Sequence, residues 1–352
     1  MKNLKDILTE GILADMDDTL SVSDFDAAKI AIDTFIRENY YPDTKYRILK
    51  SPNEDGKYVV NSKGTVHLKQ YAKSIVNDVF VWGSCKTFIC TNNQIITSLY
   101  GSPRLCEQFE CSCCSSLNSL EGGPEDVMLM KVSFSGIESL KGAPRLIRGD
   151  FDASHCDNLT SLEDGPQNCL SNYYVNHCSN LRSLKGAPKK IGYSFYCYDC
   201  PSLESLEGGP QNVLNFRCNG CNKLTSFKGA PRTIRSSFVG DCCENITSLD
   251  MSKTSIVRNF SIFGCKNLKS FEGGPKSIGD SYDAQQCRSV TSMVGLPKII
   301  LGYLHLGHCT NLSSAEGCPK EVGKSLSIQG THLHKEDVIH ICNAKHGIVS
   351  DK

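Results

Sequence analysis

The sequence has no excess of charge of either sign, because 38 lysines and arginines are balanced by 38 aspartates and glutamates over 352 residues. Such a chain lacks the electrostatic footprint of a protein that binds nucleic acid or an anionic membrane surface. It also lacks any apolar run of the ~20 residues that a membrane-spanning helix needs. We therefore expect neither a nucleic-acid partner nor a membrane partner.

Motifs of common catalytic sites are missing as well. The chain contains no glycine-rich phosphate loop, no His-Glu-x-x-His zinc motif and no nucleophile elbow. His155, His177 and Asp199 fall at equivalent positions one repeat apart and could imitate a catalytic or metal cluster, but they are at the strand edge beside the repeat cysteine, where polar residues are expected in any case. We predict a non-enzymatic protein with no catalytic residues, no metal and no cofactor.

The first residues, MKNLKDILTEGILADMDD, contain acidic side chains and no apolar core, which is unlike a secretory signal. In a secreted chain, the twenty cysteines would indicate disulfides. Without a secretory signal, we expect reduced thiols in a cytosolic setting.

The feature that organises the chain is a repeat of about 22 residues. Two copies follow one another in 151–188, each with an aromatic residue, a small or apolar residue two places later, and then Cys, Leu and Leu at intervals of three. A Gly- and Pro-containing turn closes each copy, and the turns recur at Pro103, Pro124, Pro144, Pro166, Pro188, Pro210, Pro231, Lys253, Pro275, Pro297 and Pro319. This period, with Cys and Leu at these places, is the signature of a leucine-rich repeat.

The repeat predicts an α/β solenoid of the leucine-rich-repeat horseshoe type, in which a single array forms one cooperative unit. We expect one parallel sheet on the concave side, one strand per repeat, and turns rather than helix on the convex side. Residues 1–64 are predicted to form a small α+β N-terminal cap with a helix capped by Ser23 and a hairpin. The solenoid is expected over 65–330, and a C-terminal cap over 331–352 with a short helix in 335–344. Residues 1–20 are alternatively a separate docking helix.

The turns alternate in charge. Acidic Glu121, Glu163 and Glu207 alternate with basic residues at the same position, Lys141, Lys185 and Lys228. The alternation indicates an ancestral pair of 44 residues, with opposite charges next to each other on stacked repeats.

Nine cysteines share one repeat position: Cys114, Cys156, Cys178, Cys200, Cys221, Cys243, Cys265, Cys287 and Cys309. Asn93 takes that position in the first clear repeat, so we interpret the position as one that satisfies backbone groups beyond the strand. This interpretation favours a structural cysteine ladder. Two alternatives stay open: disulfides, and a zinc site whose two Cys-x-x-Cys pairs have the spacing of a four-cysteine centre, Cys197, Cys200, Cys218 and Cys221.

Strand residues between the core positions should form the exposed face of the sheet. Three tyrosines and an arginine fall together there, and a phenylalanine lies farther along: Tyr174, Tyr196, Tyr198, Arg217 and Phe263. Tyr and Arg are enriched in binding hot spots, although aromatic residues also favour strands. We predict that these residues bind a protein partner.

With its repeat cysteines and its SLEGGPE-type turns, the array in 65–330 resembles cysteine-containing leucine-rich-repeat proteins of tailed bacteriophages, crAss-like phages among them. The opening LKDILTEGILADMDDTL is similar to a leader seen in proteins of such phages. The resemblance implies a protein-binding module without chemistry of its own, acting on a bacterial host or phage protein in the host cytoplasm or carried in the virion. The alternative function is that of a structural or virion-associated assembly component.

Overall fold

The computed structural model describes residues 24–351. It is a parallel β-solenoid of about 13 turns with helix in only 6% of the chain, which confirms the predicted leucine-rich-repeat-like fold class. The chain divides into two compact units, unit 1 ending at Arg148 and unit 2 beginning at Gly149. The proposed docking helix in 1–20 lies outside the described residues.

Unit 1 begins with helix α2 (Asp24–Asn39), whose first turn holds Asp24 and Asp26, where carboxylates suit the positive end of the helix dipole. A hairpin follows, with β1 (Arg47–Pro52) antiparallel to β2 (Tyr58–Asn61). The helix and the hairpin agree with the prediction for the N-terminal region, whereas the predicted cap residue Ser23 lies outside the described residues. The remaining strands of unit 1 pair in parallel: β3 (Thr65–His67), β4 (Phe80–Ile89), β5 (Leu105–Glu110), β6 (Asp126–Lys131) and β7 (Leu146–Ile147).

The core of unit 1 contains an irregular cluster of large rings. Tyr40 and Trp82 are almost fully buried and meet edge to face at 5.5 Å. The Trp82 Nε1–H donates a hydrogen bond of 2.8 Å to the Tyr40 hydroxyl, which itself donates to the carbonyl of Ile75. Each polar atom of this buried pair therefore has a partner, as buried polar groups require.

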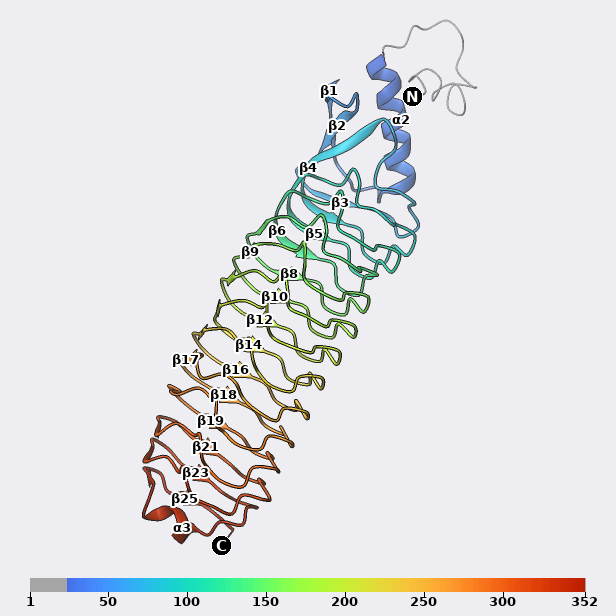
Figure 1. Ribbon diagram of the computed structural model, residues 1–352. Coiled ribbons are helices and arrows are strands. Elements are labelled where there is room, and N and C mark those ends of the chain that lie inside the picture. Colours follow the sequence, from blue (N-terminus) through green and yellow to red (C-terminus); the bar gives the residue numbers. More distant parts are fainter. Residues whose placement is uncertain (1–23, 352) are drawn as a thin grey trace, which may run out of the picture. The chain divides into compact units, whose positions relative to one another are not determined.

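Unit 2 is a stack of short rungs in which two-residue strands form parallel columns (Figure 1). The first column is β8 (Phe151–Asp152), β10 (Tyr173–Tyr174), β12 (Phe195–Tyr196), β14 (Phe216–Arg217), β16 (Phe238–Val239), β18 (Phe260–Ser261), β19 (Tyr282–Asp283), β21 (Leu304–His305), β23 (Leu326–Ser327) and β25 (Ile348–Val349). From β8 through β23, the first residue of each pair is buried in the core and the second lies on the outer face, whereas Ile348 of β25 is only partly buried.

A second column of strands contradicts the prediction of one strand per repeat. It consists of β9 (Asn168–Cys169), β11 (Lys190–Ile191), β13 (Asn212–Val213), β15 (Thr233–Ile234), β17 (Ser255–Ile256), β20 (Ile299–Ile300), β22 (Glu321–Val322) and β24 (Asn343–Ala344). These strands lie just after the turns, where an apolar side chain at the same place of each repeat from Cys169 to Val322 is buried. The prediction overlooked this position because a single apolar residue between turns shows no period of two.

Aromatic rings stack through the core of unit 2. Phe151, Tyr173, Phe195, Phe216, Phe238 and Phe260 lie one above the next, with ring centroids 4.8–5.9 Å apart. Tyr282 extends this column and meets Phe260 edge to face at 4.9 Å. The buried hydroxyls of Tyr173 and Tyr282 have no hydrogen-bond partner among residues 24–351. A hydroxyl in this position loses its hydration without compensation.

The C-terminal region differs from its prediction. Helix α3 spans only Lys335–Ile339, and the solenoid continues beyond it through β24 and β25. Among the apolar residues of 335–344, Val338 is buried, whereas Ile339 and Ile341 are 48% and 50% accessible. The chain completes one further rung instead of a longer capping helix.

Candidate functional site

The predicted tyrosines lie together on the outer face of unit 2. Parallel pairing places Tyr174 beside Tyr196, and Tyr196 beside Arg217. The Tyr174 and Tyr196 rings stack at 4.7 Å with an interplanar angle of 3°, and Tyr198 meets Tyr196 edge to face at 6.4 Å. Tyr173, Phe195 and Phe216 point into the core, so the alternation of the strand turns their neighbours outward. We call Tyr174, Tyr196, Tyr198 and Arg217 the tyrosine patch.

Phe263 is not part of this patch. It lies three rungs beyond Tyr198, which corresponds to about 14 Å along the stack. Its backbone N–H donates to Asp241 Oδ1 at 2.9 Å, and Ser261 Oγ donates to the same oxygen at 2.6 Å. Burial raises the pKa of Asp241. The predicted set of five residues therefore separates into a cluster of four and one distant aromatic residue.

His155, His177 and Asp199 lie at the corner that follows the first strand column. All three adopt left-handed backbone angles, with φ of 56°, 57° and 51°. Glycine takes the same corner at Gly220, Gly264 and Gly330, as expected where L-residues are strained. The residues therefore share a turn position that sequence reasoning did not identify, although the recurring glycines were a signal for it.

The imidazoles of His155 and His177 stack at 4.4 Å, and His177 Nδ1 lies 3.8 Å from Asp199 Oδ2. Burial and the neighbouring His177 lower the pKa of His155. Within the described residues, no group of three or more His, Cys, Asp or Glu side chains is placed to hold a metal ion. The corner thus offers a stacked pair of imidazoles next to the tyrosine patch.

The repeat cysteines bind backbone carbonyls. Each thiol donates to the carbonyl of the residue after the strand of the preceding repeat at 3.0–3.3 Å, as shown by Cys114, Cys178, Cys200, Cys221, Cys243, Cys265, Cys287 and Cys309. Burial raises the pKa of Cys200 to about 12, so this thiol keeps its proton at neutral pH and can donate. The expectation that this position satisfies backbone groups is confirmed.

In unit 1, two polar residues replace the repeat cysteine and also donate hydrogen bonds to backbone carbonyls. Asn93 Nδ2 donates to the carbonyls of Lys69 and Ala72 at 3.2 and 2.7 Å. Ser135 Oγ donates to the carbonyl of Cys111 at 2.9 Å, in the repeat that lacks the cysteine. The position therefore requires a short donor and not a thiol as such.

The cysteines of the two Cys-x-x-Cys pairs that suggested zinc also contact backbone carbonyls. Cys200 and Cys221 donate to the carbonyls of Val175 and Cys197 at 3.2 and 3.1 Å, while Cys197 lies 3.5 Å from the carbonyl of Arg217. All twenty cysteines lie in the described region, and none is in a disulfide. The repeat itself accounts for the spacing that resembles a zinc site.

A second hydrogen-bond ladder runs along the opposite side of the first strand column, and sequence reasoning missed it. Asparagine and serine alternate there as Asn172, Ser194, Asn215, Ser237, Asn259 and Ser281. Each Asn Oδ1 accepts from the backbone N–H of the following Ser, at 3.2–3.3 Å. Each of the first two Ser Oγ atoms accepts from the Nδ2 of the following Asn, at 2.9 and 3.4 Å. The alternation has the 44-residue period of the turn charges.

The turn charges pair as expected, each Lys with the Glu of the preceding repeat. The pairs are Lys141–Glu121, Lys185–Glu163 and Lys228–Glu207, with N–O distances of 2.8, 2.8 and 3.0 Å. All six side chains are more than half exposed, so these pairs contribute little to stability.

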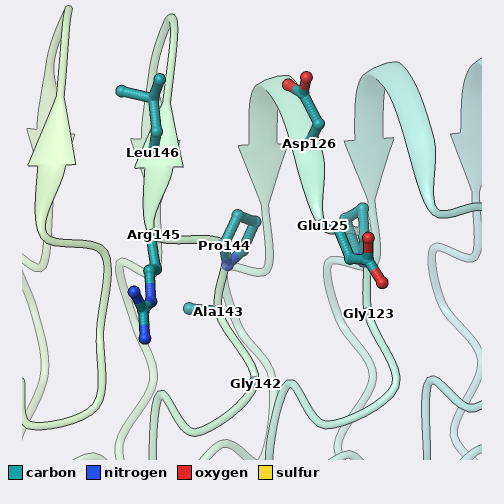
Figure 2. Close-up of a pocket in the computed structure, with 9 residues that line it drawn as sticks. Gly123, Glu125, Asp126, Gly142, Ala143, Pro144, Arg145 and Leu146 are labelled. Atoms are coloured by element: carbon teal, nitrogen blue, oxygen red, sulfur yellow. The ribbon is translucent and has the colours of Figure 1, made fainter.

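A shallow depression of about 440 Å³ lies between two outer turns of unit 1, lined by 123–126 and 142–146 (Figure 2). Its carboxylates are engaged elsewhere: Glu125 binds Arg104 at 2.9 Å, and Asp126 forms an ion pair with Arg148. Because both acids are paired with guanidinium groups, the depression presents no group poised for catalysis, and we assign it no site.

The chain matches no protein-family model, no curated protein and no solved structure. None of the helices in 24–351 combines the length and apolar character required to cross a membrane. The phage resemblance and the cellular location therefore stay predictions, and the tyrosine patch carries the functional argument.

Proposed function

We propose that the protein is a non-enzymatic binding module that recognises a protein partner through the tyrosine patch. It is encoded by a tailed bacteriophage and acts on a host or phage protein in the bacterial cytoplasm. The observation that carries the proposal is the convergence of Tyr174, Tyr196, Tyr198 and Arg217 on three consecutive rungs. Tyrosines held by ring stacking supply contact area at low entropic cost, and the exposed Arg217 can pair with a carboxylate.

One observation favours the alternative role of a structural or virion-associated component. Three apolar side chains of a single repeat, Ile299, Leu301 and Tyr303, are 50%, 60% and 38% exposed. Such an exposed apolar stripe on a folded surface suits permanent packing against a neighbour. The stripe and the tyrosine patch lie at different places on unit 2, so substitutions can separate the two roles.

The test is capture of the partner from phage-infected bacteria by the tagged full chain, followed by titration of the captured protein. Substituting Tyr196→Ala together with Arg217→Ala should weaken binding at least about thirtyfold, because hot-spot truncations cost about 2 kcal/mol or more. The matched control substitutes Lys185→Ala and Glu207→Ala on the outer turns, where exposed ion pairs contribute little.

Three results would count against the proposal: binding that survives in the patch variant, binding that is lost in the turn variant, or a chain that copurifies with phage particles in fixed stoichiometry. The last result, if abolished by Leu301→Asp and not by the patch substitutions, would establish the structural role.

A further inference from the structure

A buried hydrogen-bond acceptor lies beside the tyrosine patch without a donor. Asn176 is only 5% exposed, and its Oδ1 has no hydrogen-bond partner in the structure. Asn176 follows the inward-pointing Val175 and belongs to the column of side chains that the strand alternation turns outward. An unpaired buried carbonyl costs about 1–3 kcal/mol, which a ligand that brings a donor would recover.

Tyr174, two residues before this acceptor, stacks on an aromatic ring on one side. Its 4.7 Å stacking distance to Tyr196 equals the spacing of neighbouring strands, so the stack runs along the rungs. The opposite face of Tyr174 is therefore directed toward the preceding rung, where its register partner is the short side chain of Asp152. An aromatic face next to a carboxylate is a favourable place for a cation.

Asp152 is held in place through one of its carboxylate oxygens. Ser154 donates to Asp152 Oδ1 twice, through its backbone N–H at 2.9 Å and its hydroxyl at 2.6 Å. These two bonds fix the carboxylate and do not use Oδ2. The pKa of the Tyr174 hydroxyl is raised to about 12, mainly by burial, and the negative charges of Asp150 and Asp152 contribute to the increase.

The surrounding face is acidic. Its outward columns contain one guanidinium, Arg217, and three carboxylates, Asp152, Asp241 and Asp283, while Asp150 and Asp199 lie in the two flanking columns. The nearby His155 adds little positive charge at neutral pH, because burial and His177 lower its pKa. A positively charged group is therefore attracted to this face and a negatively charged group is repelled.

We propose that Asp152, Tyr174 and Asn176 form an amine site that takes a protonated amine or guanidinium, presented as a lysine or arginine side chain by the protein partner. The cation lies over the face of Tyr174 turned toward the preceding rung and donates hydrogen bonds to Asp152 Oδ2 and Asn176 Oδ1. Such charge-assisted bonds are the strong class of hydrogen bond. This inference rests on the proposed function, and it specifies the chemistry of the partner as a basic segment.

The test uses short fluorescein-labelled peptides of glycine and serine that carry lysine, arginine, glutamine or glutamate, titrated against the full chain by fluorescence anisotropy. We expect the lysine and arginine peptides to bind, more weakly as salt is raised, and the glutamine and glutamate peptides not to bind. The comparison of lysine with arginine distinguishes an ammonium from a guanidinium ligand. Asn176→Leu and Asp152→Asn should each weaken binding of the basic peptide at least about tenfold.

The matched control is Gln285→Leu, a change in the same outward column five rungs from Asn176. It should leave peptide binding unchanged. Asn176→Leu should also keep the fold, because it removes an acceptor that lacks a donor; if it does not fold, Asp152→Asn alone decides the test.

The amine site is wrong if the neutral or acidic peptides bind as well as the basic ones, or if both site variants bind like the wild type. Partner capture that depends on Tyr196 and Arg217 but is unaffected by Asn176→Leu and Asp152→Asn would remove the amine site and leave the proposed function standing. Loss of the amine site alone therefore differs from failure of the whole proposal.

Discussion

A buried tyrosine in each unit allows a comparison between the irregular core of unit 1 and the repetitive core of unit 2. The two tyrosine hydroxyls differ in their hydrogen bonds. In unit 1, the Tyr40 hydroxyl accepts from Trp82 and donates to the carbonyl of Ile75. In unit 2, the Tyr173 hydroxyl is equally buried and has no partner. A core made of singular contacts can provide a partner for one hydroxyl, whereas a column of equivalent rungs surrounds every ring with the same apolar neighbours.

The short donors that follow the strands show the same difference. Asn93 of unit 1 binds an irregular segment, donating to the carbonyls of Lys69 and Ala72 and accepting from the amides of Ile95 and Ile96. Cys221 of unit 2 makes one bond, to the carbonyl of Cys197. In the regular rungs of unit 2, one weak thiol donor per rung is sufficient. In the irregular segment of unit 1, the side-chain amide of Asn93 uses both its donor and its acceptor groups.

The largest effect should come from Tyr40→Phe. Removing the hydroxyl leaves the Trp82 Nε1–H and the Ile75 carbonyl buried without partners, which should lower the free energy of unfolding by about 2–4 kcal/mol. Trp82 is the single tryptophan of the chain, so its fluorescence during urea titration follows unit 1. Tyr41→Phe, at a site 37% exposed, is the control and should change little. An unchanged urea midpoint for Tyr40→Phe would show that the hydrogen bonds of the Tyr40 hydroxyl do not stabilise unit 1, and the proposed difference between the units would be wrong.

A smaller loss is expected from replacing a ladder cysteine. Cys221→Val keeps an apolar side chain in the site but leaves the carbonyl of Cys197 without its donor, at a cost of about 1–2 kcal/mol. Cys221→Ser should cost less, because Ser135 already fills this role at the equivalent position in unit 1. Urea unfolding followed by circular dichroism gives both values. If serine proved the more damaging substitution, volume and not hydrogen bonding would explain the ladder.

The smallest effect has the opposite sign. Tyr173→Phe removes a buried hydroxyl that lacks a partner and should stabilise the chain by about 1 kcal/mol. The matched change Phe195→Tyr, one rung along the same column, should destabilise it by a similar amount. Both are measured by urea unfolding. A Tyr173→Phe chain that is less stable than the wild type would show that the hydroxyl has a partner, such as a buried water.

The repeat could be predicted from the sequence because its characteristic residues lie close together in the chain and recur at fixed intervals. Leu159, Leu162 and Cys156 return at the same intervals in the next copy, so one misread residue does not change the register. Helix α2 was predictable for a similar reason: Ala28, Ile32 and Ile36 mark one face at a spacing of four, and all three are buried. The second strand column was not, because a lone Ile191 between two turns has no pattern around it.

The spacing of the repeat predicts which side chains lie on neighbouring rungs, but it does not predict their burial or their hydrogen-bond partners. The columns correctly placed Tyr174, Tyr196 and Arg217 on adjacent rungs, because parallel pairing in a solenoid follows directly from the period. The spacing also placed Phe263 farther along the array. Spacing could not distinguish Asn176 from its neighbours, since burial and a missing donor are properties of the folded surroundings.

The Asn and Ser ladder restricts how the array can change in length. Asn215 fits beside Ser194 and Ser237, and each residue complements its neighbours instead of a copy of itself. Deleting 22 residues would bring two serines or two asparagines together, whereas deleting 44 would restore the alternation. A chain shortened by 44 residues should therefore resist urea better than one shortened by 22, although it has lost more of its core. We therefore expect insertions and deletions to be tolerated in even numbers of repeats, because only these keep each asparagine of the ladder next to a serine.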